Sequence, residues 1–246
     1  MIGQIEKQLK MDDYDLEAVF TPAMVNMIIM AFVLACSIID AGIPANKPSW
    51  WTVLLSLLGS VAVAALLARF FMHFFRGTSR LFEDIHYGKD RLHFPTTSML
   101  ILSDHSISMD TKRRVRSKLK ALYNITLLSQ AKEIEDIQEA RRTAKEAFFT
   151  IRQAVAESGD TMTRRKLKRY GAFRNFLGGA LFCFPVCVIS WVVTLSKTGT
   201  NDMAILCTLL VYLIIIVVDY FLARRAAIDY AETLITTFDN INHNEA

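Results

Sequence analysis

The chain has 246 residues, of which 52% are hydrophobic and 21% charged, and it carries a formal net charge of +4. The apolar residues gather in four long segments, so the hydropathy disfavours a soluble protein. The sequence contains no GxGxxG, Walker, HExxH or GxSxG motif and no Cys/His cluster with zinc spacing. We therefore expect no enzyme, no cofactor and no bound metal.

The four apolar segments cover residues 20–39, 51–72, 176–195 and 203–222. Each has about 20 residues, which is the length that an α-helix needs to cross the hydrocarbon core of a bilayer. Backbone groups in lipid must pair internally, so these segments are predicted to be helices. The first segment follows an acidic stretch rather than a basic leader, which argues against a signal peptide. The predicted class is an all-α membrane protein with four transmembrane helices in two hairpins.

The distribution of Lys and Arg predicts the orientation. Residues 73–170 contain twenty Lys and Arg against twelve Asp and Glu, a net charge of +8, whereas each short loop between paired spans has a single Lys. Because basic segments stay in the cytoplasm, both termini and the central stretch are predicted to lie inside. The predicted domains are a cytoplasmic N-terminal segment (1–19), a first hairpin (20–72), an inserted cytoplasmic helical domain (73–170), a second hairpin (171–223), and a cytoplasmic C-terminal helix and tail (224–246), with residues 239–246 frayed.

Small residues recur every fourth position in the second segment, at Ser56, Ser60 and Ala64. Such a stripe favours close helix packing, and a weakly polar pore lining is the functional alternative. Pro185 in the third segment removes a backbone hydrogen bond and allows a kink that could serve a gate. At the inner ends of the spans, Arg69 or Arg174 is predicted to pair with Asp219.

After the second span, residues 91–102 contain Pro95, which biases the preceding residue toward an extended conformation. Thr96 or Thr97 is a candidate cap for the segment after it. The apolar run 99–102 is predicted to be either a short strand or one helical turn.

A basic helix is predicted over residues 109–128. Six cations within nine positions form a solvated face, a surface for anionic lipid, or a site for a phosphate-bearing ligand, and composition does not separate these alternatives. The six cations are Lys112, Arg113, Arg114, Arg116, Lys118 and Lys120.

A longer helix is predicted over residues 131–157, with apolar residues at alternating three- and four-residue steps. This heptad pattern predicts a partner helix, from the same chain or from a neighbouring subunit. A charged residue interrupts it and costs stability unless it meets an acid or lines a ligand site. The seam consists of Ile134, Ile137, Arg141, Ala144, Phe148 and Ile151.

Two short motifs resemble those of a known family. They are Phe94-Pro95-Thr96-Thr97, shortly after the first hairpin, and Tyr170-Gly171-Ala172-Phe173-Arg174-Asn175, at the entrance to the second. With the intervening helical region, they resemble the bacterial four-transmembrane effectors encoded beside nucleotidyltransferases in anti-phage operons, nearest the Hailong type. Where the family motifs carry Leu before Pro-Thr-Thr and Arg after it, this chain has Phe94 and Ser98, and Ala172 and Phe173 also depart from the family pattern.

The resemblance implies an effector of the bacterial inner membrane: a homo-oligomer, a tetramer in this family, forming an ion-conducting pore. A nucleotide or short DNA oligomer from a partner nucleotidyltransferase would gate the pore, and opening would depolarise the membrane and arrest growth. On this hypothesis Lys112, Arg113, Arg114, Arg116 and Lys120 hold the ligand, with Arg91, Thr96 and Thr97 nearby. The alternatives are a non-conducting scaffold whose basic helix binds anionic lipid or a partner protein, and a transporter, for which the spans offer few polar residues.

Overall fold

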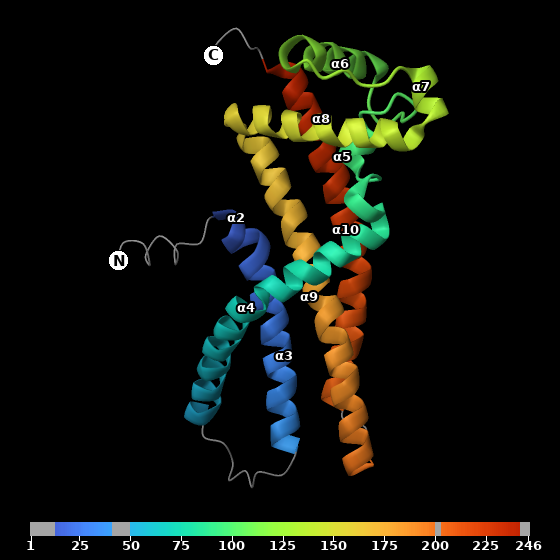
Figure 1. Cartoon of the computed structure of the whole chain (residues 1–246). Coiled ribbons are helices and arrows are strands. Elements are labelled where there is room, and N and C mark those ends of the chain that lie inside the picture. The colour runs from blue at the N-terminus through green and yellow to red at the C-terminus, as the bar shows by residue number, and fades with distance from the viewer. Residues whose placement is uncertain (1–12, 41–49, 200–202, 242–246) are drawn as a thin grey trace, which may run out of the picture. The chain divides into compact units, whose positions relative to one another are not determined.

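Two compact units divide the chain in the computed structural model, which describes residues 13–40, 50–199 and 203–241 (Figure 1). Unit 1 comprises Met1–Leu81 and Gly171–Ala223, and unit 2 comprises Phe82–Tyr170 and Arg224–Ala246. Three helices, α4, α9 and α10, contribute residues to both units.

Every regular element in the described ranges is helical, which confirms the predicted all-α class for that part of the chain. The elements are α2 (Asp13–Asp15), a π turn (Leu16–Phe20), α3 (Thr21–Asp40), α4 (Trp50–Tyr87), a 3-10 turn (Lys89–Arg91), α5 (Pro95–Ser98), α6 (Met109–Tyr123), α7 (Gln130–Glu135), α8 (Ile137–Glu157), α9 (Thr161–Thr198) and α10 (Met203–Asn240).

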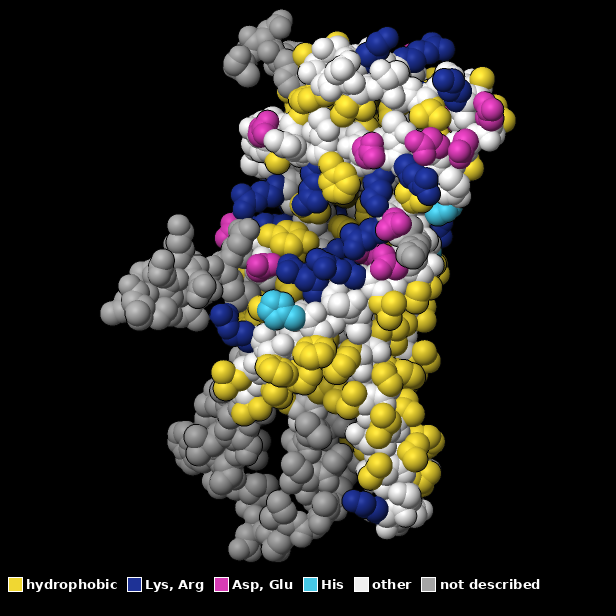
Figure 2. Space-filling view, viewed as in Figure 1, with side chains coloured by type: hydrophobic (Ala, Val, Ile, Leu, Met, Phe, Trp, Pro, Cys, Tyr) yellow, Lys and Arg dark blue, Asp and Glu magenta, His cyan; other side chains and the backbone are white. Residues whose placement is uncertain are grey.

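Helices α9 and α10 are long and apolar enough to cross a membrane by length and composition. Only 33% and 22% of their most apolar stretches are buried within the chain. Figure 2 shows many exposed hydrophobic side chains, in yellow, along this helix pair. A core helix of a soluble protein would be mostly buried, so this surface is typical of membrane association. Among the apolar side chains of the two predicted spans in these helices, the most exposed are Ile189, Met203, Leu210, Ile214 and Phe221.

Glycine allows close helix packing in unit 1. A Cβ on Gly178 would collide with the Ser79 hydroxyl and lie 2.6 Å from the Phe75 carbonyl oxygen, so α4 and α9 approach each other only because no side chain stands there. The Thr78 hydroxyl donates to the Gly178 carbonyl at 2.8 Å. On the adjoining glycine, Gly179, a Cβ would meet the buried amide of Asn26 on α3.

The core of unit 2 is built from α6, α8 and the end of α10. Val115 and Leu119 of α6 and Ile151 of α8 are fully buried, and they belong to one cluster with Leu234 and Phe238 of α10. The apolar run at 99–102 contributes Met99, Leu100 and Ile101 to the same cluster, as turns that follow the single helical turn α5.

Two predicted helices in unit 2 differ from the structure. The helix predicted over 109–128 ends at Tyr123, because Asn124 adopts a left-handed conformation (φ 54°) that closes the helix. The helix predicted over 131–157 is broken at Asp136 (φ −137°, ψ 87°) into α7 and α8. The Asp136 carboxylate accepts from the backbone N–H groups of Gln138 and Glu139, both at 3.0 Å, and so starts α8. The heptad pattern records only the spacing of apolar residues, so it does not predict the helix break at this polar cap.

Candidate anion-binding site

Helix α6 carries the basic cluster. The Ser108 hydroxyl caps its first turn by accepting from the Thr111 backbone N–H at 3.2 Å. Val115 and Leu119 anchor one face in the core, and Lys112 is buried on that same face. The other five cations are partly or fully exposed. Their environments differ so much that the predicted ligand set divides into separate groups.

Lys112 is a structural cation rather than a surface one. Its side chain is 1% exposed, and its Nζ donates to the carbonyl oxygens of Ile101, at 2.5 Å, and of Asp104. The Asp104 carboxylate lies 3.8 Å away. Burial lowers the pKa of Lys112, and the nearby Asp104 charge opposes that shift. Lys112 therefore fixes the loop before α6 and is not available to a ligand.

Arg116 also binds its own chain. Its guanidinium donates to the carbonyl oxygens of Leu128 (2.6 Å) and Leu100 (2.9 Å) and to the carboxylate of Glu133. Glu133 is buried and also accepts from the backbone N–H of Leu102 at 2.8 Å. Because the buried carboxylate neutralises the cation, this pair offers no free charge to a ligand, and removing either partner alone would leave an uncompensated charge.

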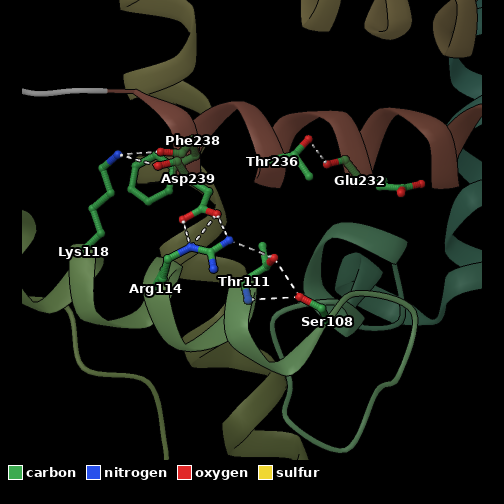
Figure 3. A network of polar contacts seen from close by, with 8 residues as sticks. All are labelled: Ser108, Thr111, Arg114, Lys118, Glu232, Thr236, Phe238 and Asp239. Carbon is green, nitrogen blue, oxygen red and sulfur yellow. Dashed lines mark hydrogen bonds and ion pairs between the residues drawn. The ribbon is translucent and has the colours of Figure 1, made fainter.

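Arg114 and Lys118 bind the last turn of α10 (Figure 3). Arg114 donates to both carboxylate oxygens of Asp239, and the closest N–O distance is 2.6 Å. Lys118 Nζ donates to the carbonyl oxygens of Phe238 (2.7 Å), Asp239 (3.3 Å) and Ile241, and lies 5.0 Å from the centre of the Phe238 ring. Cations stabilise a helix C-terminus in this way because its last carbonyl groups lack intrahelical donors. The hydrogen bond from Arg114 to Asp239 raises the pKa of Arg114, whereas burial lowers the pKa of Lys118.

The cations of α6 with exposed side chains are Arg113, Arg114 and Lys120. The Arg113 side chain is 73% exposed, and it pairs at 3.7 Å with Asp110, whose side chain is 81% exposed. Such a pair contributes little to stability, since solvent screens it. These three cations are the part of the predicted site that a solvated anion can reach.

The remaining predicted ligand residues lie elsewhere in unit 2. Thr96 and Thr97 are buried inside α5, where Pro95 is the first helical residue, so neither threonine caps the turn as predicted. Arg91 Nη2 lies 3.3 Å from the buried Glu83 carboxylate, and Arg91 Nε lies 3.8 Å from Asp84.

A tight bend presents Arg91 to Glu83. Asp90 and Arg91 both have left-handed backbones, with φ 65° and 57°. Consecutive left-handed conformations are costly for non-glycine residues. Glu83 also accepts from the Tyr170 hydroxyl, and the rings of Phe94 and Tyr170 are in contact, so the two sequence motifs meet around this carboxylate.

The heptad seam divides between core and surface. Ala144 and Ile151 are buried in the unit 2 cluster, where Phe148 packs at the edge, so their partners are in the same chain. Ile134 and Ile137 are exposed. Arg141 meets the imidazole of His93 (2.6 Å from Nη1 to Nδ1) rather than an acid.

The predicted pore and inner-edge residues lie in unit 1. Ala64 is buried, Pro185 is exposed on α9, which continues through it, and the side chains of Ser56 and Ser60 lie outside the described residues. Arg69 is exposed, Arg174 half-buried and Asp219 buried. The ion pair of Asp219 with either arginine stays a prediction.

Three acidic residues of unit 2 bind cations that sequence patterns do not connect to them. Asp239, predicted to begin a frayed tail, lies in α10 and binds Arg114. Glu83 and Glu133 lie beside other acids in the sequence (Asp84, and Glu135 with Asp136), yet each is the one buried against an arginine. The one sequence signal for such partners is the excess of cations in α6. A cation that becomes buried requires a carboxylate or carbonyl partner, so acids elsewhere in the chain are candidate partners for it.

Comparison of the chain with protein-family models, curated proteins and solved structures gives no match. The class that the fold defines is a helical protein with two long, apolar and largely exposed helices, which favours membrane association.

Proposed function

We propose that this chain is a multi-pass protein of the bacterial inner membrane, with four spans, cytoplasmic termini and a cytoplasmic unit 2. The carrying observation is the low burial of α9 and α10 in a chain whose central stretch is strongly basic. The exposed stripe on α4, at Val63, Leu66, Phe70 and Phe74, supports a further span. Unit 1 contains all the residues of the four predicted spans.

Within that class, we propose an oligomeric anti-phage effector, a homotetramer, whose ion-conducting pore is gated by a nucleotide or short DNA oligomer from a partner nucleotidyltransferase. Opening of the pore would depolarise the membrane and arrest growth. The support is the resemblance of the two motifs, whose aromatic residues Phe94 and Tyr170 pack together. Arg113, Arg114 and Lys120 supply the reachable positive charge on α6.

The test is ion flux from liposomes that contain the purified chain, with and without short single-stranded DNA. Flux that depends on the oligonucleotide supports the proposal. The matched variant is Arg113→Glu with Lys120→Glu, because these exposed cations can be reversed without breaking the Arg114–Asp239 pair. It should weaken binding while the oligomer mass stays unchanged. Absence of flux under all conditions would reject a channel.

The second candidate is a non-conducting scaffold. It is favoured by the internal engagement of Lys112, Arg114, Arg116 and Lys118, which leaves less charge for a ligand than the sequence predicts. This candidate predicts binding to anionic vesicles, no flux, and no response to oligonucleotide.

A further inference from the structure

The carboxylate of Asp239 occupies the binding edge of the Arg114 guanidinium. Arg114 Nε lies 3.1 Å from Oδ1 and 3.0 Å from Oδ2 of Asp239, and Nη2 lies 2.6 Å from Oδ2. The Thr111 hydroxyl accepts from Nη2 at 3.2 Å and helps to orient the guanidinium. Arginine uses the same planar, two-pronged geometry for carboxylates and phosphates.

The two partners differ in exposure. The Arg114 side chain is 60% exposed, whereas the Asp239 side chain is 9% exposed. The guanidinium is thus open to an incoming anion while its present partner is shielded. Arg113 is the adjacent residue, and its exposed cation adds to the attraction for a polyanion.

We propose that Arg114 and Thr111 form a phosphate-binding site that Asp239 occupies in the absence of ligand. A phosphodiester group of a short oligonucleotide competes with the carboxylate for Arg114. Arg114 and Lys118 both hold the last turn of α10, so displacement of the Asp239 carboxylate removes the Arg114 contacts and loosens the end of that helix. This inference rests on the proposed oligonucleotide ligand and adds how its site is regulated.

The experiment compares Asp239→Asn with Glu232→Gln in the full chain, purified in detergent. Glu232 is an exposed acid on the same helix, and its carboxylate points away from Arg114 in Figure 3, so its loss changes net charge without freeing that arginine. The probe is a fluorescent short oligothymidylate, and the readout is Kd from anisotropy at constant salt.

Asp239→Asn should tighten binding about fivefold, and Glu232→Gln should change it far less. Adding Arg114→Gln to Asp239→Asn should cancel the gain. In the unaltered chain, hydrogen exchange over residues 236–240 should quicken when the oligonucleotide binds. Because hydrogen exchange is measured on the unaltered chain, its outcome does not depend on whether the variants fold normally.

Three results would overturn the inference. Equal tightening by Asp239→Asn and Glu232→Gln, with normal binding by the unaltered chain, would reject competition and leave the proposed function standing. Failure of both the unaltered chain and Asp239→Asn to bind oligonucleotide would remove the proposed ligand itself. A gain confined to phosphatidylglycerol vesicles would assign the site to lipid headgroups.

Discussion

The ring of Phe94 packs edge-on against the ring of Tyr170, with centroids 5.6 Å apart. Phe94 also meets Tyr87 at 4.9 Å, and the Tyr170 hydroxyl donates to the buried Glu83 carboxylate. Aromatic rings therefore pack around the buried Glu83 carboxylate, and low local polarity strengthens a hydrogen bond to it. The two sequence motifs thus each contribute an aromatic ring to this aromatic layer.

Replacing Phe94 by alanine should destabilise unit 2 by about 2 kcal/mol, because it removes two ring contacts and admits water beside Glu83. The thermal midpoint of the purified protein should fall by about 4–8 °C. Phe149→Ala is the control, since Phe149 is 56% exposed on α8 and its loss should shift the midpoint little. Equal shifts for the two variants would show that the aromatic layer is unimportant.

Glu133→Ala should be among the most damaging single changes in unit 2. It would leave the Arg116 cation without its carboxylate in a poorly solvated position and remove the acceptor of the Leu102 N–H. Breaking one side of a buried ion pair costs about 3 kcal/mol or more. Differential scanning fluorimetry of Glu133→Ala and of the control Glu146→Ala measures the difference in thermal midpoint. Glu146 is an exposed acid on α8. A Glu133 variant as stable as the Glu146 variant would contradict the structural role of Arg116.

Gly178→Ala and Gly77→Ala should have opposite effects in unit 1. A methyl group on Gly178 meets the Phe75 carbonyl oxygen at 2.6 Å and the Ser79 hydroxyl, so α4 and α9 must separate. A methyl group on Gly77, in the middle of α4, meets nothing within 4 Å and removes the helix penalty of glycine, a gain of about 0.5–1 kcal/mol. Thermal midpoints and size-exclusion profiles of both variants would distinguish them, and tolerance of Gly178→Ala would refute the close contact.

Local patterns predict the helical class and the apolar character of α9 and α10, because hydropathy and helix length depend on neighbouring residues. They fail where the partner is distant in sequence. Nothing near Arg114 points to Asp239, and the loop carbonyl groups that bury Lys112 have no side-chain signature even though they lie close in sequence. The seam shows the same limit: its spacing predicts a partner for Ala144 and Ile151, but only the tertiary structure shows that the partner is intramolecular.

Acidification should destabilise unit 2 through His93. Burial, and then the charge of Arg141, lower the pKa of His93 below its ordinary value of 6.5. The unfolded chain therefore takes up a proton at a higher pH than the folded chain does. Stability is accordingly highest above pH 6.5 and falls as the pH drops from 6.5 toward the lowered pKa, below which the loss is constant.

His93→Gln should remove part of this slope, measured as the thermal midpoint between about pH 7.5 and 5. Burial and Arg224 also lower the pKa of His86, so a residual slope of the same sign should persist. His105→Gln, at an exposed position of the same unit, is the control and should follow the unaltered chain. If the His93 and His105 variants keep identical slopes, the Arg141–His93 contact has no influence on folding.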